Sequence, residues 1–285
     1  MNRHRVLLAA AAALLWPAAA AAQAPPTAPP VLTLPSSARV AALAGAWVAG
    51  RDQDVVFHNP AQLVGVRTDF SVSMARLGDK TNMASLTSVY TAGKLSFTLG
   101  WGVHLIDFDA TNRQNAVATI AGAVLYKGLR IGAAGKYAAD RRDINQHALL
   151  ADVGVARNIW GGAVALAVQN LGHSTLSDLG VEKLPRRVAA GFSKAQSAGP
   201  LDLALFTQVS HRSGWNSAAA GFEAGYSWIE GLSVTGRIGV RRPERTDEKP
   251  VSLGGAFTAD RLTLEYALQL FDNSKRSHLV TIRWR

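Results

Sequence analysis

The sequence predicts an all-β protein, a 14-stranded antiparallel transmembrane β-barrel with a short N-terminal hatch segment. Three observations predict this fold. Side chains alternate between apolar and small or polar along successive segments, the connections between segments alternate between short and long, and the chain begins with an export signal. We expect three regions: a signal peptide over 1–24, a Pro/Ala-rich lead-in with the N-terminal hatch over 25–67, and an outer-membrane barrel over 68–285.

The alternation is clearest in two segments. From Leu95 to Leu105 every second residue is large and apolar, and the residues between are Ser, Thr, Gly and His. From Leu262 to Leu270 the same pattern sets Leu and Tyr against Thr, Glu, Ala and Gln. Successive strand side chains point to opposite faces, so each segment has one apolar face. Because a soluble β-sandwich also alternates, periodicity alone leaves that alternative open.

The number of strands agrees with a barrel. We expect strands at about 69–77, 83–91, 94–106, 116–127, 129–139, 147–157, 162–169, 187–195, 201–210, 217–228, 231–241, 250–258, 261–271 and 278–285. That is about fourteen, and bacterial single-chain outer-membrane barrels have an even number of strands.

The connections favour the barrel over the sandwich. Short glycine turns are expected at 91–93, Lys127-Gly128 and Glu230-Gly231, since glycine accepts the positive φ that hairpin turns need. Longer hydrophilic loops are expected at 78–82, 107–115, 140–146, 170–186, 242–249 and 272–277. The two kinds strictly alternate, with a moderate exception at 197–199. Periplasmic turns are short and extracellular loops long in outer-membrane barrels, so we expect both ends of the barrel chain to face the periplasm.

The first residues read as a secretory signal. Arg3 and Arg5 precede an apolar run over 6–22, and Ala22-Gln23-Ala24 ends it. The alternative, a retained membrane anchor, is disfavoured because the run is Ala-rich, short and interrupted by Pro17. The sequence contains no cysteine, which fits an envelope protein without disulfides. We expect export with cleavage of the signal and a location in the outer membrane of a Gram-negative-type envelope.

The chain is basic, with a formal net charge of +10 that becomes +8 without the two signal-peptide arginines. No nucleic-acid-binding module accompanies this charge, and an exported barrel does not ordinarily meet nucleic acid. The basic pairs fall in the long loops or at their edges, so outer-membrane lipid with anionic head groups is the expected partner. A generally basic soluble surface is the alternative.

A family resemblance begins before the first strand. Ala44 to Gly50 is small and apolar, acidic residues follow at 52–54, and Asn59-Pro60-Ala61-Gln62-Leu63 comes next. Asn59 followed by Pro60 is a good helix start, because Asn caps open amides and Pro tolerates the first helical position, and one helical turn ending near Gly65 is expected. This stretch resembles the start of the PorV/PorQ family of outer-membrane proteins, which belongs to the FadL-like barrels. Further matches are Val168-Gln169-Asn170-Leu171-Gly172, Leu184-Pro185-Arg186-Arg187 and Ser277-His278.

The resemblance implies fourteen strands and an N-terminal segment that enters the barrel as a hatch, with Asn59, Pro60 and Ala61 holding its turn in the lumen. It implies one of two roles. The first is a channel or transporter for small hydrophobic or amphipathic compounds, with such a compound as ligand. The second is a non-transporting accessory barrel of a protein-secretion or envelope assembly, with an envelope protein as partner.

The sequence offers no catalytic, metal or cofactor site. Its seven histidines are scattered without a pair at metal-ligand spacing. No glycine elbow or other local catalytic motif is present, so we expect a protein that is not an enzyme.

Charged residues on the polar strand faces are expected to point into the lumen, because a charge in hydrocarbon costs kilocalories. These residues are Arg130, Lys136, Asp152, Asp202, Glu223, Arg237, Glu265 and Arg283. Four cations and four anions admit two interpretations. One is a set of cross-lumen ion pairs that fill and stiffen the barrel. The other is a polar path gated by the hatch, for which small inner-face residues leave room.

Overall fold

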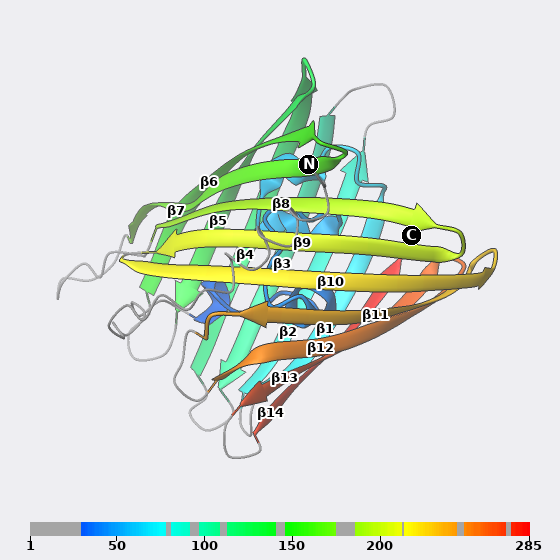
Figure 1. Cartoon of the computed structure of the whole chain (residues 1–285). Coiled ribbons are helices and arrows are strands. Elements are labelled where there is room, and N and C mark those ends of the chain that lie inside the picture. Colours follow the sequence, from blue (N-terminus) through cyan, green and yellow to red (C-terminus); the bar gives the residue numbers. More distant parts are fainter. Residues whose placement is uncertain are drawn as a thin grey trace.

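The structure is a computed structural model that describes residues 30–77, 81–91, 97–108, 113–140, 146–174, 186–212, 214–243, 248–271 and 275–285 (Figure 1). The expected signal peptide, residues 25–29 of the lead-in and Leu95 lie outside the described residues and stay predictions.

Fourteen antiparallel strands form one closed barrel, as the sequence predicts. They are β1 (Asp69–Leu77), β2 (Thr81–Thr91), β3 (Phe97–Phe108), β4 (Arg113–Tyr126), β5 (Leu129–Asp140), β6 (Gln146–Ile159), β7 (Gly162–Ser174), β8 (Arg187–Ala198), β9 (Leu201–Arg212), β10 (Trp215–Ile229), β11 (Leu232–Arg241), β12 (Glu248–Ala259), β13 (Leu262–Phe271) and β14 (Arg276–Trp284). Each strand pairs with the next in sequence, and β1 pairs with β14 from Phe70↔Trp284 to Leu77↔Ser277. Closure leaves no sheet edge with unpaired backbone groups, which a bilayer would not tolerate.

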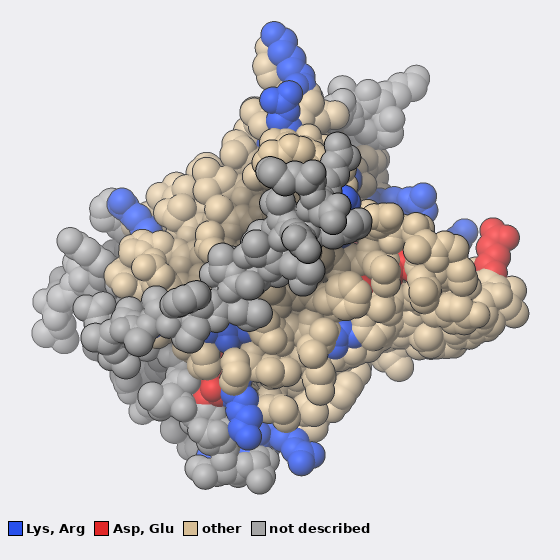
Figure 2. All heavy atoms as spheres, in the orientation of Figure 1, with Lys and Arg blue, Asp and Glu red and all other residues tan. Residues whose placement is uncertain are grey.

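The two faces of the wall separate as the alternation predicts. Leu99 and Leu264 are 44% and 50% exposed, whereas the neighbouring Thr98 and Thr263 are 1% and 5% exposed. Large apolar side chains therefore face outward and small or polar ones face the lumen. On the face drawn in Figure 2, Lys and Arg form a few separate patches among residues of other kinds.

The turns agree with the prediction in most places. Lys127 and Gly128 have φ of 48° and 78°, and Gly231 has φ of 81°. The expected exception near 197–199 is a tight connection after β8, with φ of 63° at Gly199, whereas residues 92–96 lie outside the described part of the chain. The strict alternation is wrong at two places on the long-loop side. The connection 78–80 between β1 and β2 is shorter than the connection 92–96 between β2 and β3, and β9 ends at Arg212 while β10 begins at Trp215. A two-residue hairpin fits there because Gly214 adopts φ of 87°.

Inside the barrel lies the stretch 30–66, here called the lumenal segment, drawn in blue in Figure 1. It contains η1 (Pro30–Leu32), α2 (Ala38–Ala42), η2 (Gln53–Phe57) and η3 (Pro60–Leu63). The Asn59 side chain accepts a hydrogen bond from the Ala61 backbone amide at 3.1 Å and so caps η3, as the sequence predicts. The helical turn is of the 3-10 type and ends two residues before Gly65. None of the helices in the described residues has the length and hydropathy of a membrane span.

The lumenal segment fills space that small inner-face residues leave. A side chain at Gly132 would overlap the backbone of Pro60 and Ala61, and one at Gly154 would overlap the Asn59 amide. A Cβ placed at Gly221 would lie 2.9 Å from Leu43 Cβ. Small inner-face residues are expected to leave room for a polar path through the lumen. At these three positions the lumenal segment occupies that room instead.

Candidate functional site in the barrel lumen

A closed ring of alternating charges joins the lumenal segment to one side of the inner wall. We call it the charged ring, and its members in order are Arg39, Glu223, Arg237, Glu265, Arg283 and Asp52. Arg39 donates to Glu223 twice, from Nε to Oε1 at 2.7 Å and from Nη2 to Oε2 at 2.6 Å. Arg237 then bridges two carboxylates, with 2.7 Å to Glu223 Oε1 and 2.9 Å to Glu265 Oε1.

Arg283 completes the ring with three ion pairs. Its Nε donates to Glu265 Oε2 at 2.9 Å, its Nη1 to Asp52 Oδ2 at 2.9 Å and its Nη2 to Asp54 Oδ2 at 2.7 Å. Arg39 Nη1 lies 3.4 Å from Asp52 Oδ2 and closes the circle. The Trp47 indole also donates to Asp52 Oδ1 at 3.1 Å.

The ring is built from two parts of the chain. Arg39 and Asp52 belong to the lumenal segment, while the other members stand on β10, β11, β13 and β14. Arg283 and Glu265 are 1% and 2% exposed. Removing one partner of such a buried pair leaves an uncompensated charge and is strongly destabilising. The ring therefore fixes the segment against this side of the wall.

Asp54 is an additional carboxylate beside three arginines and three acids that already balance. Burial raises the pKa of Asp54 to about 7, against the opposing effect of Arg283 and with a further increase from Asp52. Burial on its own would lower the pKa of Arg39, but its pairing with Glu223 holds it above the ordinary value. Net charge beside the ring thus changes near neutral pH through Asp54.

A second polar cluster crosses the inner wall of β3 to β8. We call it the polar row: His104, Thr119, Lys136, Asp152, Gln169 and Arg187. Thr119 lies opposite Lys136, and Lys136 Nζ lies 2.5 Å from Asp152 Oδ2. Asp152 Oδ1 also accepts from the Asn170 backbone amide at 2.9 Å, at the place where the β6–β7 register shifts.

The lumenal segment meets the polar row at Phe57 and His58. Gln169 Nε2 donates to the Phe57 carbonyl at 2.9 Å, and the Phe57 ring lies 5.9 Å from the His104 ring, edge to face. Burial first, and then the nearby charges of Arg187 and Lys136, together lower the pKa of His58 to about 3, so His58 is neutral.

The polar row is incompletely paired. His58 Nε2, His104 Nε2 and Thr119 Oγ1 are buried without a hydrogen-bond partner among the described residues. His104 and Thr119 are each 2% exposed. Such groups cost free energy unless water or a ligand satisfies them.

The structure places the predicted lumen residues as follows. Seven of them are buried on the inner side of the wall: Arg130, Lys136, Asp152, Glu223, Arg237, Glu265 and Arg283. Asp202 has the inward parity but is exposed near the start of β9, where it accepts from Ser197 Oγ at 2.5 Å. Arg130 lies outside both clusters and donates to Asn158 Oδ1 at 3.0 Å.

Sequence reasoning missed the two members of the charged ring that belong to the lumenal segment. Arg39 and Asp52 carry no strand period, so parity could not place them. The acidic pair Asp52 and Asp54 beside Trp47 was the signal available, because two close carboxylates entering a barrel need cations.

The lumen is also more apolar than the polar strand face suggests. A cluster of buried apolar residues occupies the end of the lumen towards the longer loops: Val31, Ala38, Ala41, Ala42, Ala75, Met83, Ile106, Val117, Ala138, Ala148, Leu150, Ala267 and Leu279. Leu32 and Leu34 pack against it. The start of the lumenal segment therefore covers an apolar inner wall.

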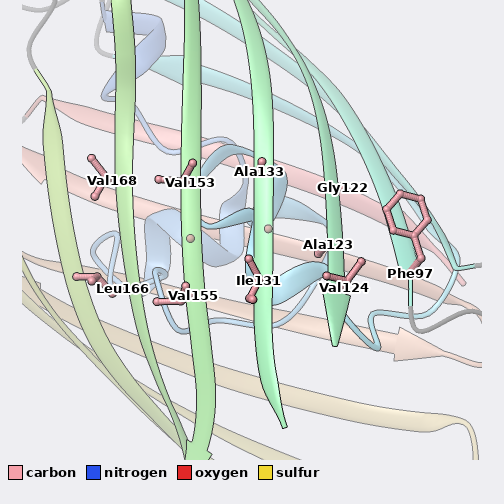
Figure 3. Close-up of a pocket in the computed structure, with 12 residues that line it drawn as sticks. Phe97, Gly122, Ala123, Val124, Ile131, Ala133, Val153, Val155, Leu166 and Val168 are labelled. Atoms are coloured by element: carbon pink, nitrogen blue, oxygen red, sulfur yellow. The ribbon is translucent and has the colours of Figure 1, made fainter. Parts of the chain in front are cut away.

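Two other features complete the picture of the barrel. Within the described residues, no group of three or more His, Asp or Glu side chains could hold a metal ion. An apolar groove of about 610 Å³ is lined by residues of β3 to β7 (Figure 3). Its larger side chains, among them Val124, Ile131 and Val153, are exposed on the outward face, so the groove faces the membrane side.

Solved structures share this fold. The toluene transporter TbuX of Ralstonia pickettii matches with a TM-score of 0.56 at 12% identity, over 90% of this chain and 100% of that chain. The toluene transporter TodX of Pseudomonas putida matches with a TM-score of 0.56 at 9% identity, over 92% and 98%. A TodX deltaS2S3 mutant, a monoaromatic hydrocarbon channel, gives 0.53 at 10% identity, over 87% and 97%.

At this identity the likeness shows the fold alone, a closed antiparallel β-barrel. No protein-family model and no curated protein sequence matches the chain, so the PorV/PorQ resemblance is not confirmed.

Proposed function

We propose that this chain is an outer-membrane channel for small hydrophobic or amphipathic compounds, with the lumenal segment as its hatch. The observation that carries the proposal is the apolar inner wall beneath Val31, Leu32 and Leu34. Displacing those three side chains would expose a concave apolar surface, and such surfaces bind apolar ligands.

The contrast between the two polar clusters supports a hatch that moves in part. The charged ring holds residues 39–54 through ion pairs, whereas the Phe57 region meets the wall through a neutral hydrogen bond and a ring contact. Motion of the segment start, with the ring intact, would open the apolar wall without expelling the whole segment.

The toluene and monoaromatic hydrocarbon channels that share the fold favour an apolar cargo over a polar one. Membership of the PorV/PorQ family, with a non-transporting accessory role, is the alternative. No observation on the described residues favours a large protein partner.

A reversible crosslink tests the channel. The chain has no cysteine, so Leu43→Cys with Gly221→Cys introduces one thiol pair between the lumenal segment and β10. A Cβ at position 221 would lie 2.9 Å from that of residue 43, so a small shift of the segment brings the pair to disulfide geometry. The purified barrel is placed in liposomes, and uptake of a hydrophobic aromatic probe is measured before and after oxidation. Because Leu43 lies in the part of the segment that the charged ring holds, we expect the reduced and oxidised proteins to admit the probe at similar rates.

The matched control is Thr258→Cys with Thr263→Cys, which joins β12 to β13 where the two hydroxyls lie 3.1 Å apart. Oxidation of this pair should leave uptake unchanged. Uptake at least about tenfold slower after oxidation of the first double variant would contradict a hatch whose ring-held part stays in place. Absence of uptake above protein-free liposomes in every form, together with recovery of a stable envelope partner, would replace the channel with the accessory role.

A further inference from the structure

We propose that the outer surface of β14 and β1, at the end towards the longer loops, binds the phosphate group of an outer-leaflet glycolipid. The site consists of Arg76, Arg276, His278 and Tyr266, here called the lipid site. It is independent of transport and rests on the orientation in which the longer loops are extracellular.

Strand register places these side chains together. Arg76 of β1 lies directly opposite His278 of β14. Arg276 and His278 are two residues apart and both exposed, so they project from the same face of β14. Neighbours across and along a sheet face lie about 5 to 7 Å apart, which is within the reach of one phosphate for arginine side chains.

Tyr266 orients the histidine. Its hydroxyl lies 2.7 Å from His278 Nδ1, and the two rings are 6.1 Å apart. A hydroxyl that donates to Nδ1 leaves the proton on Nε2, the nitrogen on the far side of the ring. His278 can then donate from Nε2 to an anion at the surface.

The depth of the lipid site matches a lipid head group. Along the outward face, Met74 precedes Arg76 and Val280 follows His278, and these two apolar side chains are 64% and 41% exposed. Along β1 and β14 the outward face therefore changes from an apolar side chain to a cationic or imidazole side chain over two residues. The boundary between hydrocarbon and head groups is where lipid phosphates lie.

Arginine is the residue suited to this chemistry. Its planar guanidinium presents paired N–H groups that match phosphate oxygens, and partial removal from water strengthens each bond. Arg76 Nη1 also donates to Asn82 Oδ1 at 3.0 Å. Five N–H groups make that contact compatible with a phosphate contact.

The barrel contains a comparison pair. Tyr137 of β5 and His147 of β6 have the same arrangement, with the hydroxyl 2.6 Å from Nδ1 and the rings stacked at 5.5 Å. The strand residue directly opposite His147 on β5 is Ala139, and the residue opposite Tyr137 on β4 is Ala118. The described strand neighbours of this second Tyr–His pair therefore contribute no cation, while the position just after β7 that corresponds to Arg76 lies outside the described residues.

Lipid retention tests the proposal. The full chain is purified in detergent and titrated with bis-phosphorylated lipid A, and bound lipid is counted by native mass spectrometry. The variant Arg76→Gln with Arg276→Gln should bind at least about tenfold more weakly than the wild type. His278→Gln should weaken binding less, and His147→Gln should have no effect. Each variant is first shown to be a folded barrel by its heat-dependent shift on gel electrophoresis.

Two further arms separate a specific phosphate site from general attraction. Lys127→Gln with Arg157→Gln removes two exposed cations from the opposite end of the strands, and it should leave binding unchanged. Dephosphorylated lipid A should bind the wild type as weakly as bis-phosphorylated lipid A binds the Arg76/Arg276 variant. Millimolar inorganic phosphate should compete only partly with bis-phosphorylated lipid A. Equal weakening by both charge-removing pairs, or equal binding of dephosphorylated lipid, would overturn the proposal.

Discussion

The charged ring and the polar row lie on different parts of the same inner wall, and they differ in how their buried charged and polar groups are paired. In the charged ring each of the three carboxylates, Glu223, Glu265 and Asp52, contacts two guanidinium groups. In the polar row the ion pair of Lys136 with Asp152 stands beside imidazole and hydroxyl groups without partners among the described residues.

This difference indicates where the lumenal segment is fixed and where it can adjust. A paired network gives one low-energy arrangement, because moving any member exposes an opposite charge. Unsatisfied groups gain hydrogen bonds when the surroundings shift or water enters. The segment should therefore be held at Arg39 and Asp52 and be more mobile near His58.

The largest expected effect comes from breaking the charged ring. Arg283→Gln leaves Glu265, Asp52 and Asp54 without their shared cation, and we expect a loss of about 3–5 kcal/mol in the free energy of unfolding. Urea unfolding in lipid vesicles, followed by tryptophan fluorescence, measures it. The control Arg130→Gln removes a buried arginine whose neutral partner is Asn158, and it should cost about 1 kcal/mol. Similar losses for the two variants would contradict the importance of the ring.

Packing at Gly132 gives the next effect. Gly132→Val places a side chain into the backbone of Pro60 and Ala61, and overpacking of this kind costs about 1–3 kcal/mol. Gly135 lies on the same strand with no atom within 4 Å of its Cβ position. Gly135→Val should therefore change stability by less than about 0.5 kcal/mol. The same unfolding assay checks both, and a tolerated Gly132→Val would show that η3 yields at this contact.

The two regions should respond to pH with opposite signs. The pKa of Asp54 is about 7 in the folded state and about 4 when unfolded, so the folded state binds the proton more tightly and stability falls as pH rises between these values. The pKa of His58 is about 3 when folded and about 6.5 when unfolded, so its contribution to stability rises with pH over that window. Each slope is at most about 1.4 kcal/mol per pH unit.

Two variants separate these slopes. Unfolding midpoints measured from pH 4.5 to 8 should rise more steeply with pH in Asp54→Asn than in the wild type. In His58→Gln they should fall more steeply. Unchanged profiles in both variants would mean that neither group is buried as the structure places it.

The wall of the barrel could be predicted from the sequence, but the contacts across its lumen could not. A period of two assigns Leu264 and Glu265 to opposite faces whatever their partners, and Asn59-Pro60 specifies its cap locally. The bond between Arg39 and Glu223 joins residues 184 positions apart, and no period or turn encodes it. Parity also gives direction without depth, which is why Asp202 is exposed at a strand end.

The smallest effect tests the unpaired side of the comparison. His104 Nε2 is buried without a partner among the described residues, and its ring packs against Phe57. Replacing an unsatisfied polar group by an apolar one of similar size is close to neutral, so His104→Leu should change the free energy of unfolding by less than about 1 kcal/mol in either direction. Urea unfolding at pH 7 measures this, and Val117→Ala at the opposed position on β4 shows that the assay detects a lost core side chain at this depth. A loss of several kilocalories in His104→Leu would mean that His104 holds a hydrogen-bonded water or ligand in the membrane.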